Sequence, residues 1–323
     1  MTRVHRWTSL DDVPADLGPT VATLGNFDGV HRGHRAVLRT VTRTAQEREL
    51  ASVAVTFDPH PVAVLHPERA PAAIAGLEHR LDLLEELGLD AVVVVEFTPD
   101  YALLTPEDFV RETFVEGLRS EVVVVGEDTR FGLHNSGDIT TLQALGEKYG
   151  FEVVVQGTVG DHLTDGLRSW SSTALRTAIA EGNMRAAAEI LDRPHRVSGV
   201  VVHGHHRGRE LGYPTANLAH DSEGLVPADG VYAGWLERPS LGGDDPERRL
   251  PAAISVGTNP TFDDVMTRTV EAYVLDRTDL DLYGETVWVD FVQRLRDNLR
   301  FDSIEELLTQ IGTDVEHTRE LLV

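Results

Sequence analysis

The sequence predicts two successive domains: a doubly wound α/β domain, and then an antiparallel β-barrel that ends in a helix. Three observations support this fold class. In the first half, short apolar runs alternate with amphipathic helical patterns, as in a parallel sheet with helices on both faces. In the second half, strand-like runs follow one another without intervening helices, as in a barrel or sandwich. The length of 323 residues suits about two domains.

The first half contains the expected βα units in order. Continuous apolar runs such as Val92–Val95 are typical of parallel strands covered on both faces. The run Thr105-Pro106-Glu107-Asp108 is a capping signal that opens a helix. The expected strands are 21–24, 52–57, 91–97, 122–125 and 151–155, and the expected helices lie around 37–45, at 78–87, after 105, at 140–149 and at 172–191.

The alternation of strands and helices ends at Pro194, which follows the last of these helices. We therefore expect a first domain at residues 1–190 and a second at residues 191–323. The second domain should contain strands at 197–202, 230–236, 252–256, 269–275 and 286–292, and a final amphipathic helix at 303–322.

Composition excludes several function classes. The 53 acidic and 29 basic side chains give a formal net charge of -24, which argues against a nucleic-acid partner or an anionic membrane surface. The sequence has no cysteine, so disulfides, thiolate metal sites and cysteine nucleophiles are excluded. No apolar run is long enough to span a membrane and no signal-peptide core is present at the start, so the cytoplasm is the expected compartment. The oligomeric state stays open, transient self-association included.

One candidate site lies where the first strand ends and a helix begins, in Gly25-Asn-Phe-Asp-Gly-Val-His31-Arg-Gly33-His34. Ligands of open α/β sheets bind beyond the carboxyl ends of the strands, and a helix N-terminus favours a phosphate. His31 and His34 are three residues apart, so both rings can face one anion and donate to developing charge. The alternative is a glycine-containing turn with two solvated histidines.

Two further segments favour a phosphate site. Thr56-Phe-Asp-Pro-His60-Pro61 follows the second strand and adds polar groups at the same edge. Trp170-Ser171-Ser-Thr173-Ala-Leu-Arg176 opens a helix, and its arginine is suited to a triphosphate. Helix capping by the hydroxyls is the competing interpretation.

The second candidate site is the run from Val200 through Gly204, Gly208 and Arg209 to Pro214-Thr215-Ala-Asn217. Its glycines and arginines are suited to holding phosphate. Thr215 and Asn217 are two apart in an extended segment, point to the same side and offer hard oxygen ligands for Mg²⁺. A basic surface loop is the alternative.

Together these motifs resemble the bacterial bifunctional riboflavin kinase/FAD synthetase (FMN adenylyltransferase) family. FDGVHRGH, TFDPHP and WSSTALR resemble its adenylyltransferase half, and GRELGYPTAN resembles its riboflavin kinase half. The resemblance continues through DGVYAG, ISVGTNPT, TVEA and DLYG to FVQRLR, and covers residues 24–322. It implies a nucleotidylyltransferase-like Rossmann domain and a riboflavin kinase barrel.

The resemblance implies two ATP-dependent reactions: riboflavin to FMN, then FMN to FAD with release of pyrophosphate. Both should need Mg²⁺. In the adenylyltransferase half, it implies that His31 and His34 stabilise the transition state. It further implies ATP contacts from Asn26, Gly33, Ser171, Thr173 and Arg176, and flavin contacts from Asp58, His60, Pro61 and Asp128.

In the kinase half, the resemblance implies that Thr215 and Asn217 bind Mg-ATP. Glu271 would take the proton of the ribityl 5′-hydroxyl, since a neutral alcohol is a poor nucleophile. It also implies phosphate contacts from Gly204, Gly208 and Arg209, and a flavin contact from Arg294. Without the surrounding match, Glu271 would be read as an outward-facing strand residue.

Several positions depart from the family pattern. Thr129 replaces an aromatic residue, and Ser169 replaces an arginine that is displaced to Arg168. Asp263 and Asp264 replace a glycine, and His205 and His206 replace a commonly acidic or small stretch. One alternative is therefore a riboflavin kinase with an impaired adenylyltransferase site. A non-enzymatic flavin-binding protein on the same scaffold is the other.

Overall fold

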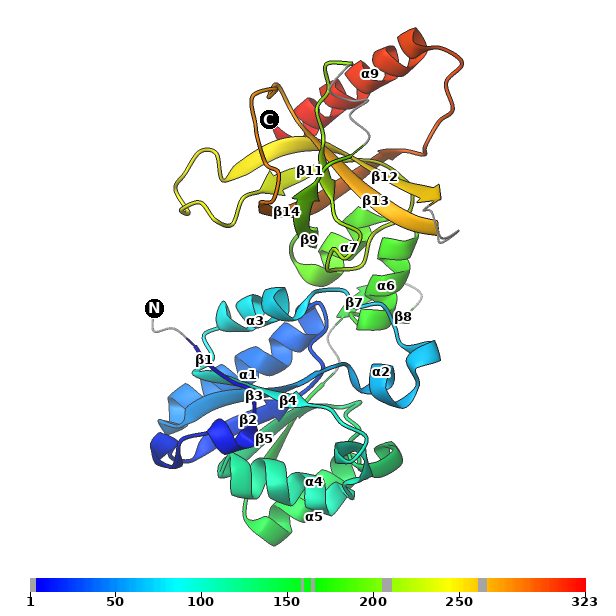
Figure 1. The fold of residues 1–323 in the computed structure, drawn as a ribbon. Helices are drawn as coiled ribbons and strands as arrows, with labels where there is room; N and C mark the ends of the chain where they lie inside the picture. The colour runs from blue at the N-terminus through cyan, green and yellow to red at the C-terminus, as the bar shows by residue number, and fades with distance from the viewer. Residues whose placement is uncertain (1–3, 158–159, 164–165, 205–210, 261–265) are drawn as a thin grey trace. The chain divides into compact units, whose positions relative to one another are not determined.

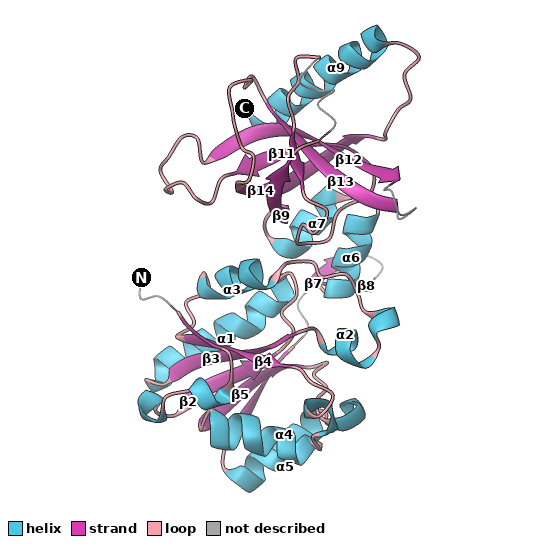
Figure 2. Ribbon diagram, viewed as in Figure 1, coloured by secondary structure: helices cyan, strands magenta, loops and turns pink. Residues whose placement is uncertain are grey.

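The computed structural model describes residues 4–157, 160–163, 166–204, 211–260 and 266–323. It divides into two compact units: one of residues 1–72 and 77–171, the other of residues 73–76 and 172–323. The break at 171/172 precedes the boundary expected at 190/191, because the helices at 172–191 group with the second unit. Figure 1 traces the chain and Figure 2 separates its helices and strands.

The first unit has a parallel sheet in the order β1-β4-β3-β2-β5-β6. Its strands are β1 (His5–Trp7), β2 (Thr20–Leu24), β3 (Ala51–Asp58), β4 (Ala91–Glu96), β5 (Ser120–Gly126) and β6 (Glu152–Gln156). The chain runs outward from β2 to β4 and then returns to the other side of β2 with β5. This reversal makes the β2/β5 junction the topological switch point, where ligands of doubly wound sheets bind.

Helices cover both faces of this sheet, with α1 and α3 on one side and α4 and α5 on the other (Figure 1). The helices are α1 (Arg32–Arg48), α2 (Pro61–Leu65), α3 (Leu77–Glu85), α4 (Pro106–Val110) and α5 (Ile139–Tyr149), with short turns at 10–12, 15–17, 67–69, 101–103 and 133–135. Thr105 caps α4 by accepting from the Asp108 amide, as its sequence signal predicts. The helix then widens into a π-helix (Arg111–Gly117), which the sequence did not indicate.

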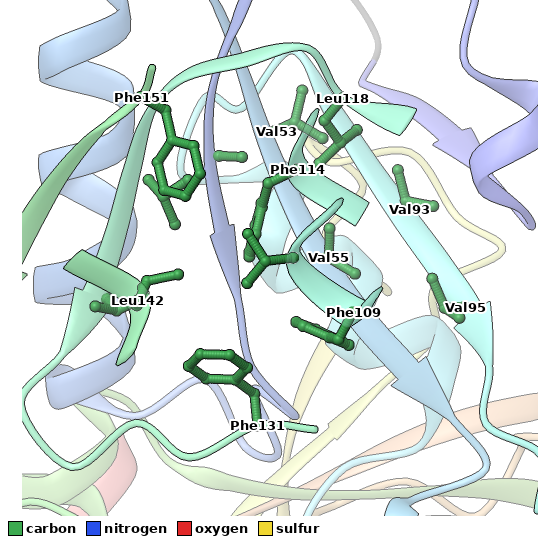
Figure 3. Packing of buried hydrophobic residues seen from close by; sticks show 14 of the residues in the cluster. Val53, Val55, Val93, Val95, Phe109, Phe114, Leu118, Phe131, Leu142 and Phe151 are labelled. Atoms are coloured by element: carbon green, nitrogen blue, oxygen red, sulfur yellow. The ribbon is translucent and has the colours of Figure 1, made fainter. Parts of the chain in front are cut away.

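The apolar strands bury the expected residues. Val53, Val55, Val93 and Val95 pack against a chain of aromatic rings on the α4/α5 side of the sheet (Figure 3). Those rings are Phe109, Phe114, Phe131 and Phe151. Because the strands alternate their side chains, Val92, Val122 and their neighbours form a separate cluster under α1 and α3.

The second unit has a closed antiparallel barrel in the order β10-β13-β12-β11-β14-β9. Its strands are β9 (His195–Val202), β10 (Ala216–Leu218), β11 (Gly230–Glu237), β12 (Arg249–Pro260), β13 (Met266–Val274) and β14 (Thr286–Arg296). The final helix α9 (Ile304–Leu322) packs on β11 and β12 and is tied to β14 by the partly buried Arg296–Asp314 ion pair, 2.7 Å long. This architecture confirms the predicted fold class.

Four further details differ from the sequence-based expectation. The helix expected at 172–191 is two helices, α6 (Ser172–Ala180) and α7 (Met184–Leu191). Gly182 between them has a φ of 71°, and the Asn183 side chain caps α7, so the continuous-helix prediction was wrong. The edge strand β1, the short β10, and a hairpin of β7 (Gly160–Leu163) and β8 (Gly166–Ser169) were not predicted.

Candidate functional site

The first candidate site is the turn between β2 and α1, which has a strained backbone. Phe27 and Val30 have φ values of 46° and 39°, in the left-handed region that a branched residue such as valine rarely adopts. Both side chains are nevertheless buried, and the Val30 amide donates to the Phe27 carbonyl at 2.9 Å. Strain of this kind persists only where the surroundings enforce it, which is typical of functional turns.

His31 and His34 lie at the start of α1 with their rings stacked, 3.6 Å between centroids and 21° between planes. His31 is the N-cap of α1, and its Nδ1 accepts from the His34 amide at 3.3 Å. Because Nδ1 accepts, the neutral His31 ring carries its proton on Nε2 and can donate from that side. One imidazole N–H is thus directed away from the helix cap.

His34 is held neutral by its surroundings. Burial, and secondarily the neighbouring His31, lowers the pKa of His34 well below its usual value. The Phe27 ring lies edge-on to it, 5.3 Å between centroids. Its Nδ1 atom is buried without a hydrogen-bond partner among the described residues. A neutral His34 at a helix N-terminus can donate to an anion without adding a buried positive charge.

The WSS segment reaches this turn through Trp170. A Cβ added to Gly33 would lie 2.9 Å from the Trp170 carbonyl oxygen, so Gly33 permits close packing of the two backbones. The Arg32 guanidinium lies over the Trp170 ring, 4.0 Å from its centroid. The structure therefore places Ser171, the next residue, close to the histidine turn. Thr173 and Arg176 are on α6, in the second unit.

Arg80 is a residue of this site that sequence reasoning missed. It is 5% exposed and projects from α3. Its guanidinium donates to the Asn26 carbonyl at 3.0 Å and the Phe57 carbonyl at 3.1 Å, and lies 3.6 Å from the Asp58 carboxylate. The pKa of Arg80 is lowered overall, because the effect of burial exceeds the opposing effect of the Asp58 and Asp28 carboxylates. One arginine thus holds the carbonyl ends of two neighbouring strands, and its position inside the apolar pattern of α3 was the available signal.

The other predicted residues of this half lie along the same carboxyl edge. His60 caps α2 by accepting from the Val62 amide at 3.2 Å, and Pro61 is the first residue of that helix. Asp58 ends β3. Asp128 lies in the turn after β5, where the Thr129 amide donates to the Gly126 carbonyl at 3.1 Å. Asn26 contributes its carbonyl to Arg80, as described above.

The second candidate site lies on the barrel strands β10 and β13. Asn217 is paired in register with Glu271, and Glu271 with Ser255 of β12. The Asn217 amide group donates to the Thr215 hydroxyl and carbonyl oxygens, both at 3.1 Å. Neighbouring Ala216 and Ala272 are buried in the barrel, so the opposite face carries Asn217 and Glu271.

Gly204 completes this arrangement from the end of β9. A Cβ added there would lie 2.6 Å from the Asn217 side chain, so only glycine fits against the amide. The Asn217 side-chain nitrogen donates to Thr215, so the side-chain oxygen of Asn217 points away from Thr215. Gly208 and Arg209, and the divergent positions His205, His206, Asp263 and Asp264, lie outside the described residues.

Arg294 belongs to a different cluster of the barrel. It donates to the Asp229 carbonyl and pairs with the Asp297 carboxylate at 2.9 Å. The Asp229 carboxylate in turn accepts from Thr258 at 2.7 Å and from Arg268 at 3.0 Å. Arg294 therefore has a structural function at the start of β11.

In the part of the chain that the structure describes, no group of three or more His, Asp or Glu side chains could hold a metal ion by itself. Within the same residues, no helix is both long and apolar enough to cross a membrane.

The comparisons with known proteins cover both units. A family described as FAD synthetase matches residues 13–173, and one described as riboflavin kinase matches residues 191–322. A bifunctional riboflavin kinase/FMN adenylyltransferase from Escherichia coli strain K12 is 38% identical over 300 residues, which are 93% of this chain and 92% of the relative. A protein of the same description from Listeria monocytogenes is 35% identical over 314 residues, 97% of this chain and 93% of the relative.

A solved structure is similar to this chain over nearly its whole length. A Streptococcus pneumoniae protein described as a macrolide-efflux protein has a TM-score of 0.85 and 33% identity, and the similarity covers 98% of both chains. The two family matches give the order of the halves in this chain, and the relatives match it across both halves. The chain belongs to the bifunctional riboflavin kinase/FMN adenylyltransferase family, with an FAD synthetase half followed by a riboflavin kinase half.

Proposed function

We propose that this enzyme phosphorylates riboflavin to FMN with ATP and then adenylylates FMN to FAD with a second ATP. The observation that carries the second step is the stacked His31–His34 pair at the N-terminus of α1, beside the switch point of the sheet. We assign adenylylation to residues 1–190 and phosphorylation to residues 191–323. The segment 174–190 lies between the two matched family ranges.

In the adenylylation step, a phosphate oxygen of FMN attacks the α-phosphorus of ATP. The new O–P bond forms as the bond to the bridging oxygen breaks, and pyrophosphate leaves with that electron pair. His31 Nε2–H and the neutral His34 donate to the oxygens on which charge develops. Asn26, Gly33, Ser171, Thr173 and Arg176 are proposed to position ATP. Catalysis of this kind depends on positioning and electrostatics and needs no covalent enzyme intermediate.

In the phosphorylation step, the ribityl 5′-oxygen of riboflavin attacks the γ-phosphorus of ATP and ADP leaves. Glu271 accepts the hydroxyl proton, which makes the alcohol a competent nucleophile. Its position beside Asn217, across the β10–β13 pair, supports this assignment because acid–base and phosphate-binding groups then share one face. Gly204, Gly208 and Arg209 are proposed to contact phosphate.

The oxygens of Thr215 and Asn217 suit Mg²⁺, a hard ion that usually retains several waters. The donor set fits, since the Thr215 hydroxyl and the Asn217 amide are hydrogen-bonded neighbours. When bound there, Mg²⁺ would neutralise phosphate charge.

The proposed flavin neighbours in the adenylyltransferase half are Asp58, His60, Pro61 and Asp128. In the kinase half, the proposed flavin neighbour is Arg294. The dependence of both steps on ATP favours the cytoplasm, and the net charge of -24 argues against nucleic acid as a partner.

A chromatographic time course tests both steps at once. Wild-type protein with riboflavin, ATP and MgCl₂ should accumulate FMN and then FAD. His34→Gln should stop at FMN, whereas Glu271→Gln should make no FMN but still convert supplied FMN to FAD. His66→Gln and Glu320→Gln are matched controls at exposed positions. Accumulation of FMN without FAD by the wild type would instead favour the kinase-only alternative.

A further inference from the structure

Thr23 carries a hydroxyl group in an otherwise apolar part of the first unit. The residue lies on β2, two positions before Gly25, and is completely buried. Strand alternation puts its side chain on the same face of the sheet as Val21, which packs in one cluster with Leu38 and Val41 of α1. Among the described residues, the Thr23 Oγ1 atom has no hydrogen-bond partner. A buried hydroxyl without a partner costs free energy, so this one calls for an explanation.

His34 has the matching property. Of its two ring nitrogens, only Nδ1 is both buried and without a hydrogen-bond partner among the described residues. His34 precedes Leu38 and Val41 on α1 with the spacing of one helix face, and both of those residues are buried against the sheet. The Nδ1 atom is therefore enclosed within the unit, and Nε2 is the ring atom that is available to a substrate.

The carboxyl end of β2 brings these two side chains to one aromatic ring. The Gly25 amide still donates to the Val55 carbonyl of β3 at 3.0 Å, so the alternation of the strand continues to Gly25. A Cβ added to Gly25 would therefore lie on the same face as Thr23, and it would be 3.0 Å from the Phe27 ring. The Phe27 ring in turn lies edge-on to His34, 5.3 Å between centroids. Thr23 is only one strand repeat, about 7 Å, from Gly25. Thr23 and His34 thus approach the same ring from two sides.

We propose that Thr23 is a positioning residue for adenylylation, joined to His34 Nδ1 by one buried water. Waters in protein interiors typically bond to polar groups that would otherwise lack a partner. A water that donates to Nδ1 leaves the ring proton on Nε2, so His34 presents an Nε2–H donor to a substrate phosphate. The choice of nitrogen matters because the lowered pKa of His34 keeps its ring neutral, with a single N–H. The inference rests on the proposed FMN adenylyltransferase function.

Nitrogen-15 NMR of the histidine rings tests the hydrogen bond, because the chemical shifts of the two ring nitrogens depend on which one carries the proton. The His34 signals are those absent from His34→Gln. In the substrate-free wild type at pH 7.5, they should show a protonated Nε2 and a hydrogen-bonded Nδ1. Thr23→Val keeps the shape of the side chain and removes the hydroxyl, so the Nδ1 signal should shift away from its hydrogen-bonded position. Thr23→Ser retains a hydroxyl and should restore the wild-type signal.

The kinetic readout is kcat for FMN adenylylation. Thr23→Val should lower kcat about tenfold, the effect of one hydrogen bond, and should change the KM for ATP by less than about twofold. Thr20→Val is the matched control, since Thr20 is also fully buried on β2 and its hydroxyl donates to the Leu118 carbonyl at 2.9 Å. This control removes a buried hydroxyl from the other end of the strand and should change neither the His34 signals nor kcat. Riboflavin phosphorylation, which uses the other half, should be unchanged in every variant.

The outcomes separate the inference from the proposed function. Altered His34 signals together with a lower kcat in Thr23→Val, both restored in Thr23→Ser, support the inference. If the wild type makes FAD, the inference is refuted by unchanged His34 signals in Thr23→Val, by an unchanged kcat, or by equal changes in Thr20→Val, and the proposed function stands. If the wild type makes no FAD from FMN and ATP, the proposed function fails and the positioning function fails with it.

Discussion

Replacing Arg80 with methionine should destabilise the first unit and impair FAD synthesis, although Arg80 has no proposed contact with substrate. Methionine retains most of the apolar side-chain volume and removes only the guanidinium. The substitution leaves the Phe57 carbonyl without the donor at 3.1 Å and the Asn26 carbonyl without the one at 3.0 Å. Asn26 precedes the strained turn to His31, so its release should also disturb the histidine pair.

The magnitude follows from the two hydrogen bonds. Bonds from a charged donor contribute about 1.5–3 kcal/mol each. The Asn26 carbonyl keeps the Thr56 hydroxyl as a donor at 3.2 Å, so its loss is the smaller one. The Asp58 carboxylate, 49% exposed, adds little because water screens the pair. We expect a total of about 3 kcal/mol, or a decrease in Tm of about 6–12 °C for a unit of this size.

The assay must report on the first unit alone. The four tryptophans divide evenly, with Trp7 and Trp170 in the first unit and Trp235 and Trp288 in the second. Urea unfolding in a Trp235→Phe/Trp288→Phe background therefore follows the first unit by its own fluorescence. FMN adenylylation and riboflavin phosphorylation are measured on the same preparations.

Arg43→Met is the matched control, because it removes an exposed arginine from the same unit and should change stability by less than about 0.5 kcal/mol. The reasoning would be refuted by an Arg80→Met protein that loses less than about 1 kcal/mol and adenylylates FMN at the wild-type rate. Loss of stability with full activity would show that Arg80 holds the fold but does not position the turn.

Three further predictions concern the same unit. Gly33→Ala should lower FAD synthesis at least about tenfold while FMN synthesis is retained, because its Cβ would lie 2.9 Å from the Trp170 carbonyl oxygen and must displace that backbone. The pKa of His34 lies well below 6.5 in the folded state, so as the pH falls His34 binds a proton in the unfolded state before it does so in the folded state. The free energy of unfolding should therefore decrease as the pH drops from 7.5 to 5.5. In urea titrations His34→Gln should lose less stability over that interval, and an equal loss would contradict the assignment. Burial raises the pKa of Tyr101 to about 12, so Tyr101→Phe should remove the last step of the tyrosinate absorbance titration. The free energy of unfolding of the wild type should also decrease above pH 10, because the Tyr101 phenol ionises there in the unfolded state but not in the folded state.

Local sequence signals predicted the elements that surround both sites. The apolar run before Gly25 and the helical spacing after it placed His31 and His34 at a strand–helix turn. Thr105 capped its helix as its motif indicates. The break between α6 and α7 could also have been predicted from the sequence, since a glycine that ends a helix, Gly182, is followed at once by an N-cap residue, Asn183.

Contacts between segments distant in sequence were not predictable in this way. Arg80 reaches Asn26 across 54 positions, and no periodicity indicates which carbonyl a buried arginine will find. The Arg32–Trp170 stack and the buried Nδ1 of His34 depend equally on tertiary packing. The three-residue strand β10 is too short for an alternation pattern, yet it closes the barrel and brings Asn217 opposite Glu271.

The strongly acidic composition and the anionic substrates are compatible because charge acts over short distances at these sites. At physiological ionic strength, interactions between exposed charges are largely screened beyond about 8 Å. The net charge of -24 therefore slows the approach of ATP or FMN more than it opposes their bound state. Within the proposed site, the helix N-terminus and the histidine pair would act on a phosphate at contact distance, where screening is weak. Reversing the charge of distant surface acids should thus change the association rates of ATP and FMN more than their dissociation rates.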